Sequence, residues 1–184
     1  MSKVCAFFAD GLEEVEALTV VDLLRRAEVE VTTVSIGQQT EVLGSHGIRL
    51  HADTTLDQVD DFMKFEMVFL PGGGLGTENL EKNQQVRDVI GSFFAAGKRI
   101  AAICAAPGIL GAMGLLKGRK ATSYPSVTGR LEGAEVTENP AQTDGNITTS
   151  RGVGTAIDMG LELIKILCGE EKSIEIGREI VYLP

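Results

Sequence analysis

The stretch KRIAAICAAPGILGAMGLL, residues 98–116, contains the change of pattern that decides the fold. An apolar run of strand length ends at Cys104, and small residues and Pro107 follow at once. An uninterrupted apolar run is typical of a strand that is buried on both faces of a parallel sheet. We therefore predict a buried strand over 98–104 that passes directly into a helix over 107–116.

The rest of the chain repeats this alternation of short strands and amphipathic helices. Further strands are predicted at 3–9, 29–36, 65–70, 120–125 and 144–150, a hairpin at 41–52, and further helices at 13–27, 83–97, 154–169 and 170–181. Such alternation indicates a parallel sheet whose crossovers are right-handed and whose two faces are covered. We expect an α/β protein, a flavodoxin-like doubly wound sandwich with a mostly parallel central sheet and helices on both faces.

The composition is that of an ordinary globular protein and disfavours several classes of partner. The chain of 184 residues fits one domain, 1–184. Its net charge of −9 disfavours nucleic acid and anionic membranes, because both attract clustered Lys and Arg. No apolar run approaches the ~20 residues of a membrane span, and the N-terminal stretch lacks the features of a secretory signal. We expect a cytoplasmic protein without nucleic-acid or membrane partners.

Cysteine and histidine are few and scattered. Cys5, Cys104 and Cys168 show no metal-ligand spacing and do not suggest a disulfide framework. The chain has two histidines, His46 and His51, so the sequence gives little reason to expect a zinc site. We expect function without a metal or an organic cofactor.

Four segments follow predicted strands and should meet at one edge of the sheet. They are ADGLEEVE (9–16), PGGGLG (71–76), CAAPG (104–108) and SRGVGT (150–155). In open parallel sheets the active crevice lies at the carboxyl ends of the strands. The chemistry of the protein is therefore expected in these four loops.

Cys104 has two interpretations from its local sequence. A strand that turns sharply into a helix has the geometry of a nucleophile elbow, and the free N–H groups at a helix start favour a thiolate. A buried cysteine is equally often an inert small apolar residue. The glycines after the third strand are also ambiguous. Gly72 and Gly73 could bring backbone N–H groups to an oxyanion, form an imperfect dinucleotide loop, or make an ordinary turn.

Charged residues near the other two loops complete the candidates. Glu13 and Glu14 suit the first turn of a helix, where carboxylates complement the helix dipole. Glu16 is flanked by apolar residues, and an inward carboxyl would have a raised pKa and act as an acid or base. Arg151 could bind an anionic substrate or a second subunit, or it could be an ordinary surface residue.

Taken together, these loops resemble the ThiJ/PfpI superfamily, in particular the branch of the parkinsonism-associated protein deglycases and their bacterial ThiJ-like relatives. The resemblance rests on GLEEVE, DLLRRA, LPGGGLG, AAICAAPG and TSRGVGTAID, which occur in the family's order across nearly the whole chain. It implies a homodimer with the flavodoxin-like fold. It also implies a glutathione-independent glyoxalase or a deglycase, acting on small carbonyl compounds or on glycated amines and thiols.

The resemblance assigns roles to particular residues. Cys104 matches an oxidation-prone nucleophile, and Glu16 matches a protonated glutamate that hydrogen-bonds its sulfur. Backbone N–H groups facing the site match those of Gly72, Gly73 and Ala105. Further residues near the pocket or the dimer interface match Arg26, Ser150 and Arg151.

Three positions depart from relatives of this family. Tyr124 stands where some have a histidine, and tyrosine, with a pKa of about 10, cannot act as a base at neutral pH. Ala105 follows the cysteine where proteolytic relatives have a histidine, and this difference argues against protease activity. His46 stands where the parkinsonism-associated protein has an arginine near its pocket.

Two functions remain open from the sequence. In the first, Cys104 attacks the aldehyde of methylglyoxal and Glu16 moves a proton between the two adjacent carbons. In the second, Cys104 is oxidised to a sulfinate that switches a redox-regulated chaperone or partner surface. Both use the same residues.

Overall fold

The structure is a computed structural model that describes residues 2–182. Its main sheet has seven strands in the order β10-β11-β7-β6-β1-β2-β5. All neighbours pair in parallel except β10 and β11, which are antiparallel. The strands are β1 (Lys3–Phe8), β2 (Glu30–Ser35), β5 (Thr54–Thr55), β6 (Met67–Leu70), β7 (Arg99–Ile103), β10 (Ala141–Asp144) and β11 (Ile147–Ser150). The predicted mostly parallel α/β sheet is confirmed.

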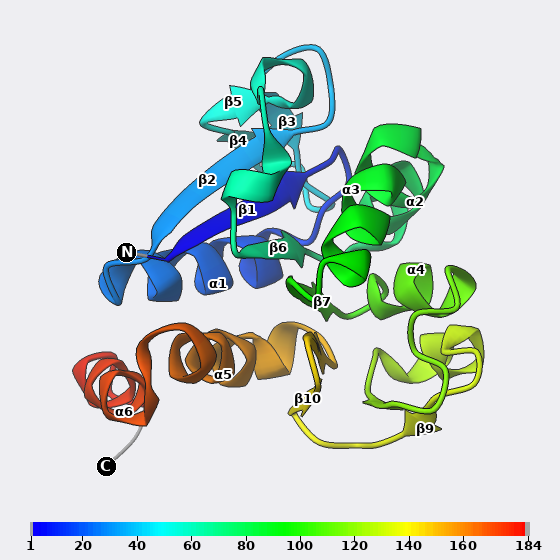
Figure 1. The fold of residues 1–184 in the computed structure, drawn as a ribbon. Helices are drawn as coiled ribbons and strands as arrows, with labels where there is room; N and C mark the ends of the chain where they lie inside the picture. Colours follow the sequence, from blue (N-terminus) through cyan, green and yellow to red (C-terminus); the bar gives the residue numbers. More distant parts are fainter. Residues whose placement is uncertain (1, 183–184) are drawn as a thin grey trace.

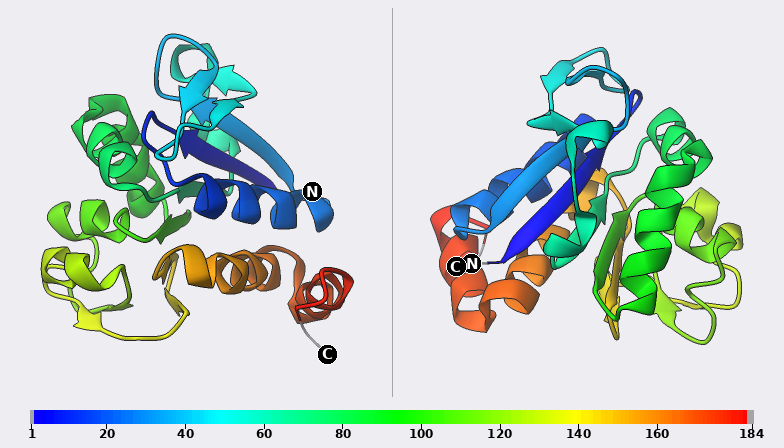
Figure 2. Two further views of the ribbon diagram at one scale, coloured as in Figure 1. Left: turned by 180° about the vertical axis from the view of Figure 1, so that it is seen from behind. Right: turned by 45° about the horizontal axis from the view of Figure 1, so that its top comes forward.

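Helices cover both faces of this sheet (Figures 1 and 2). One face packs against α1 (Glu14–Arg26), α5 (Ala156–Cys168) and α6 (Glu170–Glu179), and the other against α2 (Gly74–Lys82), α3 (Gln84–Ala95) and α4 (Pro107–Ala112). Strand β1 shows why its sequence is apolar throughout. Val4 and Ala6 point into the first layer, whereas Cys5 and Phe7 point into the second.

Two small sheets and several short 3-10 turns lie outside the main sheet. Strands β3 (Glu41–Leu43) and β4 (Arg49–His51) form the predicted antiparallel hairpin, and β8 (Lys120–Ala121) pairs in parallel with β9 (Glu135–Val136). Short 3-10 turns occupy Leu56–Gln58, Phe62–Lys64, Pro125–Arg130 and Val153–Thr155. Within residues 2–182, no helix is long and apolar enough to cross a membrane.

The sequence prediction missed helix α2 and strand β10. Helix α2 begins inside PGGGLG, where four glycines lower helix propensity. Tertiary contacts fix it instead: the N–H of Gly76 and the side chain of Asn79 donate to the carbonyls of Gly11 and Asp10 in the loop after β1. The predicted strand 120–125 is only two residues long, and the helix after Cys104 ends at Ala112 rather than 116.

Candidate active site

Cys104 lies at a strained turn between β7 and α4. Its φ is 64°, which is uncommon for a residue other than glycine. Two backbone hydrogen bonds fix this conformation. The N–H of Cys104 donates to the carbonyl of Ser150 at 3.0 Å, and the carbonyl of Cys104 accepts from the N–H of Tyr124 at 2.9 Å. The partly buried thiol is therefore presented at the carboxyl edge of the sheet, as the nucleophile-elbow interpretation requires.

The loop after β11 supports this turn from the next strand. The hydroxyl of the fully buried Ser150 is 2.6 Å from the carbonyl of Pro140 and 2.8 Å from the hydroxyl of Thr155. The Thr155 hydroxyl in turn accepts from the N–H groups of Arg151 and Gly152. Ser150 thus holds the loop through its side chain and Cys104 through its carbonyl. Thr155 was not among the predicted site residues, since a lone threonine after a glycine gives no chemical signal in the sequence.

The side chain of Glu16, on α1, places its carboxyl group next to Cys104. The side chain is fully buried, and its Oε2 accepts from the N–H of Gly72 at 3.1 Å. A Cβ at Gly152 would lie 3.6 Å from Glu16 Oε1 and 4.0 Å from Cys104 Sγ, so carboxyl and thiol face the same small space. A Cβ at Gly72 would lie 2.3 Å from Glu16 Oε2 and 2.5 Å from the Cβ of Cys104. Glycine at 72 is therefore required for the two groups to approach.

Burial sets the protonation of this pair. Burial, reinforced by the charge of Glu13, raises the pKa of Glu16 to about 7 despite hydrogen bonds that favour its ionised form. Burial, together with the charge of Glu16, raises the pKa of Cys104 to about 12. The raised pKa of Glu16 was predicted, but the prediction of an acidified thiol is wrong, because burial outweighs the backbone donors at the helix start. From neutral pH upward, the pair shares one proton and one negative charge.

Two backbone donors would stabilise a negative charge on the sulfur when the thiol loses its proton. The N–H groups of Gly73 and Ala105 hydrogen-bond Cys104 and oppose the rise in its pKa. Gly73 has a φ of 91°, and a Cβ there would lie 2.3 Å from the carbonyl of Gly11. The structure thus brings Cys104, Glu16, Gly72, Gly73 and Ala105 together.

The remaining predicted residues lie at different distances from this centre. The half-exposed Tyr124 flanks it, with its ring 3.5 Å from the Cβ position of Gly152. Arg151 donates through its guanidinium to the carbonyl of Glu138. Arg26 lies at the opposite end of α1 from Glu16 and forms ion pairs with Asp22 and Glu179. The structure therefore does not place Arg26 near Cys104 and Glu16.

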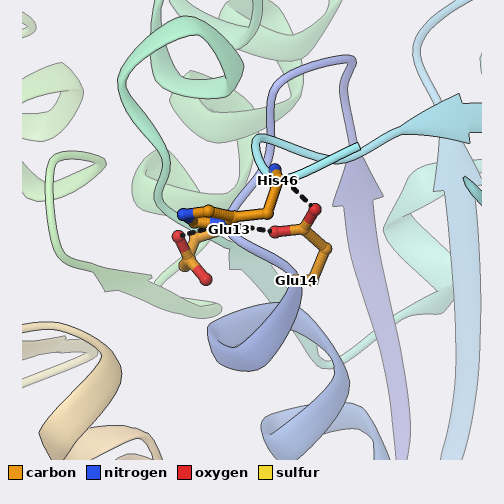
Figure 3. A group of neighbouring side chains, drawn as sticks. All are labelled: Glu13, Glu14 and His46. Carbon is orange, nitrogen blue, oxygen red and sulfur yellow. Dashed lines mark hydrogen bonds and ion pairs between the residues drawn. The ribbon is translucent and has the colours of Figure 1, made fainter. Parts of the chain in front are cut away.

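His46 lies on the loop between β3 and β4, against the start of α1 (Figure 3). Its Nδ1 is 2.9 Å from Glu14 Oε2, and this contact and the neighbouring carboxylates raise the pKa of His46. Burial alone would raise the pKa of Glu14. Hydrogen bonds from His46, from Ser45 and from the backbone N–H of Glu14 itself outweigh burial and lower this pKa to about 2. His46 therefore faces a carboxylate that is ionised at neutral pH.

Residues 2–166 match the family model described as "DJ-1/PfpI family". The chain belongs to the DJ-1/PfpI family. The match covers the loops that carry Glu16, Gly72, Cys104 and Ser150, so the resemblance inferred from the sequence is confirmed.

Individual DJ-1/PfpI proteins are similar over nearly the whole chain. Protein DJ-1 homolog B of Arabidopsis thaliana is 38% identical over 184 residues, which are 99% of this chain and 42% of the plant protein. The glutathione-independent glyoxalase DJ-1 of Schizosaccharomyces pombe is 33% identical over 181 residues, 94% of each protein. The chain therefore spans less than half of the plant relative and nearly all of the yeast relative. The solved structure of oxidized Toxoplasma gondii DJ-1 superposes with a TM-score of 0.95 at 32% identity, covering 99% of both chains.

Proposed function

We propose that this DJ-1/PfpI protein is a glutathione-independent glyoxalase that converts methylglyoxal to lactate. One observation carries the proposal: a buried carboxyl group with a pKa near 7 faces a strand-end thiol on which two backbone N–H groups converge. A pKa near the working pH lets one group donate and accept protons in turn. The name of the yeast relative supports the same activity.

The first step is transfer of the thiol proton from Cys104 to the Glu16 carboxylate and addition of the resulting thiolate to the aldehyde carbon of methylglyoxal. The C–S bond forms as the carbonyl π pair moves to oxygen, and the N–H groups of Gly73 and Ala105 are the available donors for that oxyanion. Protonated Glu16 then supplies its proton to the oxyanion, which yields a neutral hemithioacetal. Glu16 is left as a carboxylate, ready to act as a base.

The second step moves hydrogen between the two adjacent carbons. Glu16 takes the proton from the carbon attached to sulfur, the C–H electron pair forms a C=C bond, and the ketone π pair moves to its oxygen, which gives an enediolate. Glu16 then returns the proton to the neighbouring carbon, while the hydroxyl proton of the first carbon passes to the enediolate oxygen and the first carbon becomes the thioester carbonyl. The product is a lactoyl thioester of Cys104. Water cleaves the C–S bond, releases lactate and restores the thiol, so the sequence is an internal redox isomerisation with no external oxidant or reductant.

The same hemithioacetal chemistry extends to glyoxal adducts of amines and thiols. Such adducts either release a free aldehyde or keep a carbon at the oxidation level of an aldehyde, and the Cys104 sulfur can attack that carbon. We therefore propose a deglycase activity as well. Free methylglyoxal remains the substrate that tests the chemistry of Cys104 most directly.

Alanine at Gly72 is expected to disrupt the site while leaving the fold intact. Its Cβ would displace Cys104 or Glu16, because the two lie 2.5 and 2.3 Å from its position. Misplacement by about 1 Å costs on the order of 10²-fold in rate, so lactate formation should fall by at least that factor. Gly74→Ala is the matched control, since nothing lies within 4 Å of its Cβ position. Equal rates in the two variants would argue against the close Cys104–Glu16 approach.

We also propose a homodimer through the exposed apolar side of α1. Val15 and Leu18 are exposed large apolar residues on that helix, and Val153 is an exposed apolar residue in the loop after β11. An exposed apolar cluster on a soluble chain indicates a protein contact.

Light scattering after gel filtration tests this interface. We expect twice the chain mass of 19.6 kDa for the wild type and a single chain mass for Leu18→Asp. The control is Leu75→Asp, at a similarly exposed leucine on α2, which should remain dimeric. A monomeric wild type, or a dimeric Leu18→Asp, would contradict the proposed contact.

A further inference from the structure

We propose that Glu13, Glu14 and His46 form a binding site for a divalent transition-metal ion such as Zn²⁺ (Figure 3). The site lies where the loop between β3 and β4 meets the start of α1, and it contains neither Cys104 nor the carboxyl of Glu16. This site was not predicted from the sequence, because the two carboxylates and the imidazole are about thirty residues apart along the chain.

The donor atoms already stand at the separations that a metal ion needs. His46 Nδ1 is 2.9 Å from Glu14 Oε2 and 3.5 Å from Glu13 Oε2. Zinc binds nitrogen and carboxylate oxygen at about 2.0–2.2 Å in a tetrahedron, which places ligand atoms about 3.3 Å apart. The Oγ of Ser45 lies 3.0–3.2 Å from the same three atoms. It or a water molecule would complete the coordination.

Glu14 is held in place by contacts that leave one oxygen for a ligand. Its Oε1 accepts from the backbone N–H of His46 at 2.8 Å and faces that of Ile48 at 3.5 Å. Its Oε2 points instead toward the His46 ring. The side chain is 2% exposed, and it fits because residue 44 is a glycine, whose Cβ would lie 2.2 Å from Oε1. Backbone donors to the second oxygen are the support that orients carboxylate ligands in metal sites.

Charge and access favour a cation at this place. Two carboxylates and a neutral imidazole carry a charge of −2, which a divalent ion would neutralise. A bound ion would compete with a proton for the imidazole nitrogen of His46. The side chain of His46 is 68% exposed, so the site is open to an entering ion and its remaining water. A mixed nitrogen and oxygen donor set selects Zn²⁺, Co²⁺ or Ni²⁺ over Mg²⁺ and Ca²⁺.

Isothermal titration with Zn²⁺ at pH 8 tests the site on the full chain. We expect one ion per wild-type chain and at least about 10-fold weaker binding for His46→Gln and Glu13→Gln. His51→Gln is the matched control, because it removes the other histidine from the same hairpin, and it should bind like the wild type. Circular dichroism of each variant checks that a loss of binding is not a loss of fold.

A Cys104→Ser variant separates this site from the thiol. It should retain the ion, and Co²⁺ bound to the wild type should show no sulfur-to-metal charge-transfer band. Absence of binding by the wild type, unchanged binding by His46→Gln, or loss of the ion in Cys104→Ser would each overturn the proposal. None of these measurements depends on turnover, so failure of the metal site and failure of the glyoxalase proposal are distinguishable.

Discussion

Serine in place of Cys104 is expected to lower lactate formation from methylglyoxal, without glutathione, by at least about 10³-fold. The N–H groups of Gly73 and Ala105 lower the pKa of the thiol, and the carboxyl of Glu16 faces the same small space as the sulfur. A serine hydroxyl at the same φ of 64° can occupy the same position, but its pKa is far higher and it is a much weaker nucleophile. The geometry is thus preserved while the chemistry is lost. Lactate is measured enzymatically at several protein concentrations.

Cys168→Ser provides the control for this experiment. Cys168 is exposed at the C-terminal end of α5, and its sulfur lies 3.9 Å from the carbonyl of Ala27. It should turn over at the wild-type rate. A Cys104→Ser variant with the wild-type rate would contradict the covalent mechanism. A wild type that is inactive although its mass shows a reduced Cys104 would contradict the glyoxalase proposal and favour the redox-sensing alternative.

The fold was predictable wherever burial leaves a pattern in the sequence. Strands β1, β6 and β7 are buried on both faces, so each reads as an apolar run of the right length. Helices α3 and α5 end as predicted, because Gly97 and Gly169 adopt positive φ just beyond them. Helix α2 was missed because its sequence is rich in glycine and its start is fixed by contacts with the loop after β1.

The candidate site was predictable only in part, for a related reason. The convergence of strand ends predicted that Cys104, Glu16 and Gly72 would meet, since parallel topology dictates it. The direction of the thiol pKa was not predictable. It depends on how deeply Glu16 and Cys104 are buried together, which the elbow pattern does not encode. The contact of His46 with Glu14 was missed because a hairpin loop brings them together across 32 residues.

Glutamine in place of Glu16 is expected to lower the rate by about 10²–10⁴-fold, the range typical of a lost general acid–base group. The amide is nearly the same size, and its oxygen can still accept the N–H of Gly72. It can neither give a proton to the oxyanion nor take one from carbon. The wild-type rate should rise with pH toward the pKa of Glu16 near 7, and the residual rate of Glu16→Gln should lose that dependence. Initial rates of lactate formation between pH 5 and 8 measure both effects.

The same variant should be more stable than the wild type at alkaline pH. The pKa of Glu16 is about 7 in the folded protein against an ordinary value of 4.5, so the folded state holds its proton more tightly. Wild-type stability therefore falls as pH rises from 4.5 to 7, and the loss is complete above 7. At 1.36 kcal/mol for each pKa unit, Glu16→Gln should gain about 2–3 kcal/mol relative to wild type between pH 5 and pH 8.

Urea unfolding at the two pH values measures this gain, with Glu162→Gln as the control. Glu162 lies on α5, where its carboxylate accepts from the hydroxyl of Thr143 at 2.7 Å, and its substitution should give no comparable pH-dependent gain. A Glu16→Gln variant that is more stable than the wild type at pH 8 but forms lactate more slowly would show that the buried carboxyl destabilises the fold. It would also show that the reaction needs the proton of that carboxyl. A Glu16→Gln variant whose relative stability did not change with pH would show that the carboxyl is not protonated near neutrality, and the proton-transfer steps assigned to Glu16 would lose their basis.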